Sequence, residues 1–223
     1  MPNQAQASRI ANVAGAVWRE PIVTPGAWTR ASIGGKDGFA YRLSDAHLQA
    51  IESVLQKTRS TPPQRVERRH FDHPLLNAVL ADIKREIVHG RAVVIIQGLS
   101  PDRFSPDDLE RICWGFGTHW GFAHCQNVNG DRLGRIRNEN MEKGYKSTGE
   151  LTFHSDPFQI LGLFCVQNAE SGGVTKLISS LTIHNEILKA RPDLLPALYG
   201  TLVVPQGVVA ELAAAVLKLA GEG

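Results

Sequence analysis

The residue pair with the clearest potential for chemistry is His154 and Asp156, which stand one residue apart in the segment LTFHSD. In a β-strand, residues i and i+2 point to the same face, so a strand here would direct the imidazole and the carboxylate into one space. They would supply two of the three ligands of a 2-His-1-carboxylate triad, which binds Fe(II) and leaves open positions for other ligands. The pattern H-x-D is short and arises by chance in many chains, so its context has to support it.

The other histidines give weaker signals. Those within or beside predicted helices are interpreted as ordinary surface or core residues. His119, His124 and Cys125 are close in sequence. Their spacing, H-x4-H-C, matches no common structural zinc site, and no second group of cysteines supplies the missing ligands. We therefore expect no zinc site at these residues.

Helices with clear boundaries precede the H-x-D pair. Ser44 is a predicted N-cap for a helix with apolar residues at helical spacing, and a second helix is predicted from about Pro74 to His89, with Gly90 as its stop. Ser105 at the N-cap and Pro106 at the first position predict a third helix over 105–117. Between the last two, the β-branched run 91–99 predicts a buried strand.

The composition changes on either side of these helices. Residues 1–40 are rich in Gly, Pro, Ala and Ser and predict an extended arm with little regular structure. Beyond residue 125, four short segments predict an antiparallel sheet: RLGRIRN, LTFHSD, FQILGLFCV and VTKLISS. The segment ILGLFCV is apolar at odd and at even positions, which face opposite sides of a strand, so we expect it to be covered on both faces. Two short helices are predicted around 183–190 and 192–199.

Several motifs, in this order, resemble the TauD/TfdA family of Fe(II)/2-oxoglutarate-dependent dioxygenases. They are LGRIRNEN, GYKSTGELTFHSD, ILGLFCV, SGGVTKLISS and IHNEILKARPDLLPALY, between Leu133 and Leu198. The upstream strand RAVVIIQGL and the helix ending in WGFG are similar to the N-terminal part of that family. The resemblance extends over about residues 40–200. It implies an α+β fold, an incomplete double-stranded β-helix (jelly roll) with flanking helices.

The resemblance also implies residue roles. It assigns iron binding to His154 and Asp156, and 2-oxoglutarate binding to Thr175 in the turn Gly172-Gly173-Val174-Thr175. Two glycines let the backbone approach a ligand, and a hydroxyl can donate to its carboxylate. The alternative is that Thr175 is a plain strand residue after a hairpin. Asn138 is a weaker candidate for the substrate side. The implied reaction uses O2 and 2-oxoglutarate to oxidise a small organic substrate and releases succinate and CO2.

The sequence departs from the family after residue 200. The family has a distal histidine that is the third iron ligand and an arginine that binds 2-oxoglutarate, and neither is found here. His184 is the one histidine after Asp156, in a predicted helical region, and no arginine follows Arg191. We expect a domain at 41–200 that is truncated, by a shortened gene or a frameshift, and a divergent, helical tail at 201–223. The alternative function is an inactive relic or an interaction module that pairs through an open sheet edge.

Composition excludes several other classes of protein. Among 223 residues, 24 Lys and Arg against 22 Asp and Glu give a net charge of +2, which argues against nucleic acid or an anionic membrane as partner. Three cysteines cannot pair completely, which favours a reducing compartment. No apolar run approaches the roughly 18 residues of a membrane span, and no secretory signal is recognised. The sequence therefore predicts a cytoplasmic oxidoreductase with a small-molecule substrate, able to self-associate through the open edge.

Overall fold

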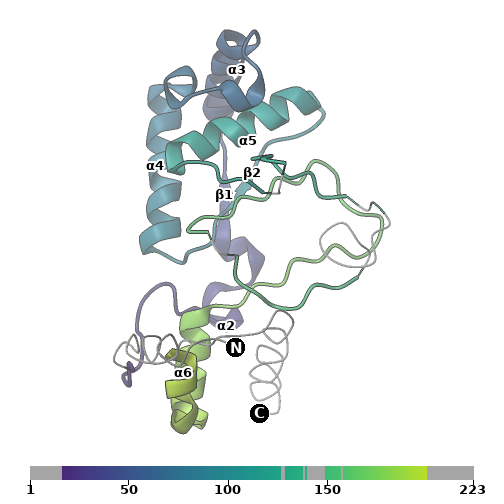
Figure 1. Ribbon diagram of the computed structural model, residues 1–223. Coiled ribbons are helices and arrows are strands. Elements are labelled where there is room, and N and C mark those ends of the chain that lie inside the picture. The colour runs from purple at the N-terminus through teal and green to yellow at the C-terminus, as the bar shows by residue number, and fades with distance from the viewer. Residues whose placement is uncertain (1–16, 127–128, 138, 140–148, 157, 200–223) are drawn as a thin grey trace, which may run out of the picture. The chain divides into compact units, whose positions relative to one another are not determined.

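The computed structural model describes residues 17–126, 129–137, 139, 149–156 and 158–199 (Figure 1). The chain divides into two compact units. The arm–helix unit comprises Met1–Thr29, Glu150–Ser155 and Lys176–Gly223, and the helical unit comprises Arg30–Gly149 and Asp156–Thr175. The described residues are a mixture of helix and sheet. Among the described helices, none combines the length and the apolar character needed to cross a bilayer.

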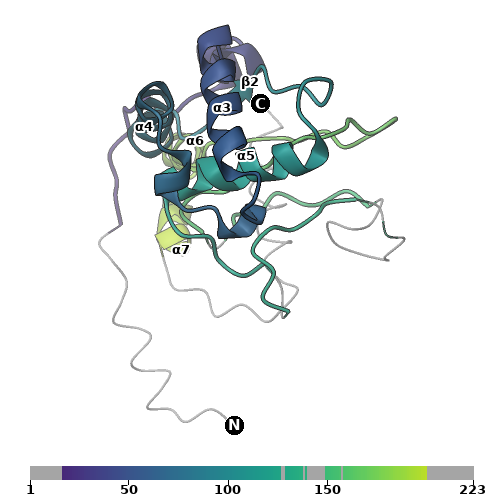
Figure 2. The same ribbon diagram turned by 90° about the horizontal axis from the view of Figure 1, so that it is seen from above.

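Three helices form the centre of the helical unit: α3 (Asp45–Thr58), α4 (Pro74–His89) and α5 (Pro106–Trp120). Each contacts the other two, and Figure 2 shows α3 crossing α5. Ser44 and Ser105 cap α3 and α5 as predicted, each accepting a backbone N–H with its hydroxyl. α4 has the predicted bounds, and α5 continues three residues beyond the predicted end.

Side chains from all three helices form one hydrophobic core. Phe71 is the last residue of a 3-10 turn, η3 (Arg68–Phe71), and is fully buried. Its ring meets Phe116 edge-on, with 6.1 Å between centroids. Gly115 gives this ring its space, because a Cβ there would lie 2.6 Å from the Phe71 ring. Other fully buried residues of the core are Ile51, Val54, Leu76, Leu80, Ile83, Leu109 and Ile112.

The described sheet consists of two short parallel strands, β1 (Ala40–Arg42) and β2 (Ile95–Gln97), with Tyr41 opposite Ile96. The prediction of a buried strand over 91–99 is therefore correct in part. The strand is shorter than predicted, and it is not buried, since Ile95 is 36% exposed. A short helix α2 (Arg30–Ile33) and the turn η1 (Lys36–Phe39) precede β1, inside the region expected to lack regular structure.

The segments expected to form an antiparallel sheet are irregular. The described residues of 121–137 and 149–179 include no strand, so the four strand predictions are not met there. Phe164 packs against the helical core, but Leu161 and Leu163 are 54% and 63% exposed. The prediction that this apolar segment is covered on both faces is wrong. Of this segment, Phe164 packs on the core, whereas the leucines are left exposed.

The arm–helix unit is built around α6 (Ser180–Ala190), followed by η4 (Pro192–Leu194) and α7 (Leu195–Tyr199). These helices were predicted, with α6 starting three residues earlier than expected. Polar side chains at the start of α6 bind the backbone of the arm. Asn185 pairs with both the N–H and the C=O of Ile22, at 2.8 and 2.9 Å, and Thr182 donates to the carbonyl of Trp28 at 2.6 Å. The predicted tail helix at 201–223 lies outside the described residues.

Candidate metal site

His154 lies in an irregular segment of the arm–helix unit and is exposed to solvent. Its Nδ1 atom is 2.7 Å from the carbonyl oxygen of Thr152. A carbonyl oxygen can only accept a hydrogen bond, so Nδ1 carries the proton and, in the neutral ring, Nε2 carries the lone pair. Metal-binding imidazoles usually show this pattern, with the second nitrogen donating to a carbonyl or a carboxylate. The contact with Thr152 thus assigns the proton of the neutral His154 ring to Nδ1.

Asp156 is also exposed, and it belongs to the helical unit. The two units meet in the sequence between Ser155 and Asp156, so each candidate ligand is described within its own unit. An imidazole nitrogen and a carboxylate oxygen are donor types that Fe(II) accepts, and the two residues fit two of the three protein positions of a facial triad. Within the part of the chain that the structure describes, no group of three or more His, Cys, Asp or Glu side chains is placed to hold a metal ion.

Thr175 is exposed and follows a turn that needs glycine. Gly172 and Gly173 have φ angles of +74° and +66°, in the left-handed region. The turn predicted from the two glycines is thus confirmed, and its geometry explains both of them without a ligand. The assignment of Thr175 to 2-oxoglutarate stays a prediction. Asn138 lies outside the described residues. Arg135, three residues before it in the sequence, forms an ion pair with Glu110 at 2.9 Å.

His184 is buried and hydrogen-bonded within the arm–helix unit. It is 5% exposed, and both ring nitrogens have partners. Nε2 lies 3.2 Å from the carbonyl oxygen of Glu20, and Nδ1 lies 3.1 Å from the hydroxyl of Tyr199. Since the carbonyl only accepts, Nε2 donates and Nδ1 accepts from the hydroxyl. These two bonds support the expectation that His184 does not replace the distal iron ligand.

The residues weighed for a zinc site are also used elsewhere. His119 is buried, and its Nε2 lies 3.2 Å from the carbonyl oxygen of Phe71. Burial lowers the pKa of His119, and the charge of Arg68 acts in the same direction. The ring of His124 stacks on Phe158, with 5.2 Å between centroids. Both histidines therefore have packing roles, which supports the expectation that no zinc site lies here.

Neither of two hollows in the helical unit is lined by a candidate ligand. One, of about 280 Å³, lies between β1 and α4 and is lined by the ion pair of Glu86 and Arg91, at 2.5 Å. The hydrogen bond from Arg91 lowers the pKa of Glu86, and Arg91 also donates to the carbonyl of Gly38. The second, of about 210 Å³, lies beside Arg103, which pairs with Glu52 at 2.8 Å.

One contact near the candidate ligands could not be found by sequence reasoning. Glu150 and Lys176 form an ion pair at 2.6 Å although they are 26 residues apart. Glu150 lies in the motif GYKSTGELTFHSD and Lys176 in SGGVTKLISS, but neither motif predicts a contact between the two residues. No signal in the sequence pointed to this pair.

Residues 56–212 match the family described as "Taurine catabolism dioxygenase TauD, TfdA family". This match covers more than half of the chain, and the chain belongs to that family. Membership confirms the resemblance inferred from the motifs around His154.

Two curated relatives are similar to most of this chain. "FR-33289 synthase" from Streptomyces rubellomurinus (strain ATCC 31215) is 24% identical over 194 residues, which are 82% of this chain and 57% of that protein. "Taurine hydroxylase-like protein SAT17" from Stachybotrys chartarum (strain CBS 109288 / IBT 7711) is 27% identical over 187 residues, which are 77% of this chain and 49% of that protein. The chain therefore spans about half the length of the curated relatives it matches.

Proposed function

We propose that this protein belongs functionally to the Fe(II)/2-oxoglutarate-dependent dioxygenases, a class of oxidoreductase. Its substrate would be a small organic molecule, oxidised with O2 while 2-oxoglutarate is converted to succinate and CO2. Membership of the TauD/TfdA family supports this class. The same membership supports a jelly roll, of which the described residues would be an incomplete part. The cytoplasmic location and the absence of nucleic-acid and membrane partners stay predictions from composition.

The observation that carries the proposal is the hydrogen bond between His154 and Thr152. It leaves the lone pair of a neutral imidazole on Nε2, the atom farther from the backbone. An exposed histidine with no such bond can adopt either tautomer and many ring orientations. The carbonyl of Thr152 instead fixes both, as the outer partners of metal ligands do.

In the proposed site, each residue has one task. His154 Nε2 and the carboxylate of Asp156 would hold Fe(II), which when bound supplies the activation of O2 that the reaction requires. The hydroxyl of Thr175 would donate a hydrogen bond to a carboxylate of 2-oxoglutarate and orient it. The side chain of Asn138 would contact the organic substrate. Two protein ligands hold a metal less tightly than three, so we expect weak iron binding by this chain.

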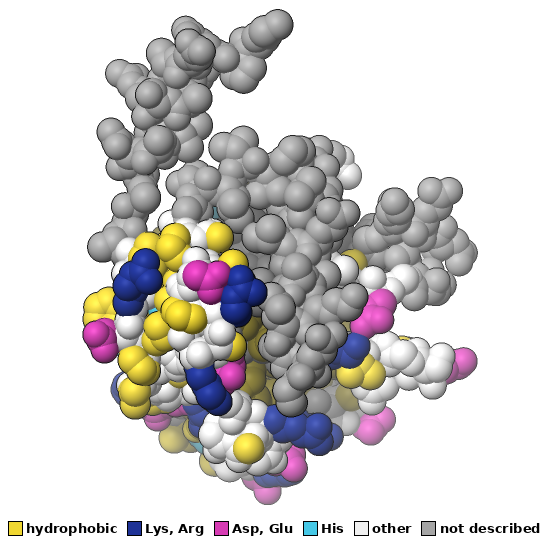
Figure 3. Space-filling view, turned by 90° about the horizontal axis from the view of Figure 1, so that it is seen from below, with side chains coloured by type: hydrophobic (Ala, Val, Ile, Leu, Met, Phe, Trp, Pro, Cys, Tyr) yellow, Lys and Arg dark blue, Asp and Glu magenta, His cyan; other side chains and the backbone are white. Residues whose placement is uncertain are grey.

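A second candidate function is an interaction module that pairs with another chain, including a second copy of this one. The exposed leucines at 161 and 163 favour it, because such side chains gain free energy when another surface covers them. On the face drawn in Figure 3, the described acidic and basic side chains are interspersed.

Metal binding separates the two functions. We would titrate the purified chain with Fe(II) under anaerobic conditions, with and without 2-oxoglutarate, and follow heat and visible absorption. His154→Ala should abolish binding. His89→Ala is the matched control, since His89 is exposed in the last turn of α4 and should leave binding unchanged.

The outcomes point in opposite directions. Binding that needs His154, followed by O2 consumption in the presence of 2-oxoglutarate, supports the dioxygenase. A chain that binds no iron contradicts it. If that chain also sediments as a concentration-dependent oligomer, the interaction module becomes the better account.

A further inference from the structure

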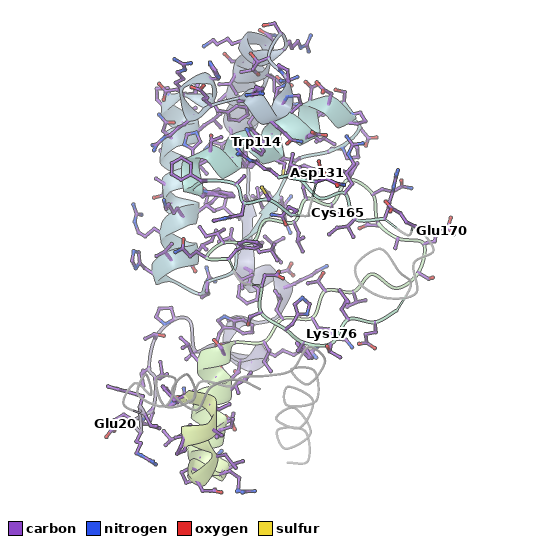
Figure 4. The ribbon with its side chains drawn as sticks, viewed as in Figure 1. Glu20, Trp114, Asp131, Cys165, Glu170 and Lys176 are labelled. Atoms are coloured by element: carbon purple, nitrogen blue, oxygen red, sulfur yellow. The ribbon has the colours of Figure 1, made fainter. Side chains whose placement is uncertain are left out.

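The ion pair of Glu150 and Lys176 connects two parts of the arm–helix unit (Figure 4 labels Lys176). The carboxylate oxygen and the ammonium nitrogen are 2.6 Å apart, although both side chains are largely exposed, at 77% and 59%. The hydrogen bond from Lys176 lowers the pKa of Glu150, and the positive charge acts in the same direction.

Lys176 lies close in sequence to Ser179, a residue that hydrogen bonds hold in place. Three residues further on, Ser179 is buried and caps α6, accepting the N–H of Thr182 at 3.1 Å. Its hydroxyl also donates to the carbonyl of Gly26 in the arm, at 2.6 Å. The backbone leading to Lys176 is thus held by a helix N-terminus and by the arm.

The Glu150 end of the pair lies in a segment without helix or strand. Glu150 is four residues before His154, and described residues 149–156 contain no regular element. A segment without a hydrogen-bonded ladder depends on individual side-chain contacts for its position. The bond to Lys176 is such a contact, and it reaches the segment that carries the proposed iron ligand.

We propose that Glu150 and Lys176 are positioning residues of the metal site, whose ion pair fastens the His154 segment to the N-terminal end of α6. This inference rests on the proposed function. Lys176 directly follows Thr175, the proposed 2-oxoglutarate ligand, in the sequence. Neither residue touches the metal; each acts through the segment that it holds.

The size of the effect follows from the exposure of the pair. Exposed ion pairs contribute modestly, so losing one partner should weaken metal binding about two- to fivefold. Salt screens exposed charges, and the Debye length falls to about 3 Å at 1 M salt. The difference between the wild type and either single variant should therefore disappear at high salt.

The test uses the full chain and cobalt(II), whose visible absorption reports its ligand set. Lys176→Met and Glu150→Gln should each raise the cobalt(II) dissociation constant about two- to fivefold at low salt. The exchange of both residues, Glu150→Lys with Lys176→Glu, should restore it. Arg191→Met is the matched control. It removes another exposed ion pair of the same unit, with Asp193 at 2.8 Å, which is remote in sequence from His154.

Each result has one meaning. A wild type that binds no cobalt(II) overturns the proposed function. Binding by the wild type that neither single variant changes overturns the positioning role alone, as does an equal loss in Arg191→Met. Failure of the exchanged pair to restore binding also overturns it, because restoration requires the attraction and not the individual side chains.

Discussion

The helical core and the segment 158–175 belong to the same unit, yet apolar side chains are buried in the core and largely exposed in the segment. Leu80 on α4 is 1% exposed, whereas Leu163 is 63% and Val174 is 77% exposed. In the core, each helix brings its own apolar stripe to its neighbours. In the segment, Phe164 packs on the core, but most apolar side chains remain exposed. Apolar character alone therefore does not bring about burial.

This contrast locates the stability of the helical unit. Burying one leucine side chain is worth about 1.5 to 3 kcal/mol. The leucines of α3, α4 and α5 contribute on this scale, and those of 158–175 contribute little. We expect three experiments to sharpen or break this comparison.

The largest effect is expected from Leu80→Ala compared with Leu163→Ala. Removing the buried side chain should lower the free energy of unfolding by about 2 to 5 kcal/mol, because it leaves a cavity in the core. Removing the exposed one should change it by less than about 0.5 kcal/mol. Urea unfolding followed by circular dichroism measures both.

A loss of more than about 1 kcal/mol in Leu163→Ala would contradict the comparison, since an exposed side chain cannot leave a cavity. It would show that another surface covers this segment in solution. Repeating the measurement at several protein concentrations would tell whether that surface belongs to a second copy.

An intermediate effect is expected from two glycines of α5. Gly115→Ala would place a Cβ 2.6 Å from the Phe71 ring, so overpacking should cost about 1 to 3 kcal/mol. Gly117→Ala meets nothing within 4 Å and should stabilise the helix by about 0.5 to 1 kcal/mol. Thermal unfolding of the two variants should therefore shift in opposite directions. Shifts in the same direction would mean that the Phe71 ring does not pack on Gly115.

The smallest effect is expected from His119. Burial lowers its pKa, so the folded state disfavours the charged ring, which the unfolded state accepts freely. The contribution is fully present above the unfolded pKa and is lost as the pH falls through the folded pKa. Opposing this shift, the carbonyl of Phe71 and the carboxylate of Asp72 favour the charged ring.

Urea unfolding between about pH 8 and pH 5 would measure this contribution. Wild type should lose stability on acidification, and His119→Gln should lose less. His89→Gln, at an exposed position, should keep the wild-type slope. If wild type and His119→Gln gave the same slope, the buried histidine would not be responsible.

The helices could be predicted because their signals are local. Ser44 and Ser105 lie one residue before the helices they cap, and Gly90 directly follows α4. The strands could not be predicted in the same way. A strand needs a partner that may be far away in the sequence, and an alternating apolar pattern says nothing about where that partner is.

The candidate site shares this limit. The H-x-D spacing identified His154 and Asp156 as candidates, and their role as iron ligands stays a prediction. The argument that alternation directs both side chains to one face assumed a strand, and the described segment is irregular. The hydrogen bond from His154 to Thr152 and the pair of Glu150 with Lys176 both depend on the folded backbone, so neither could be read from spacing.

The arm that α6 holds by its backbone has a consequence for the order of events during synthesis. Ile22 and Asn185 are 163 residues apart. At about 5 to 20 residues per second, a ribosome needs roughly 8 to 33 s to cover that distance. Helix α3 can begin to form in this interval, because its contacts are local. The arm is made first and docks late, so a nascent chain stopped before residue 179 presents residues 20–28 without Ser179, Thr182 and Asn185, which bind their backbone.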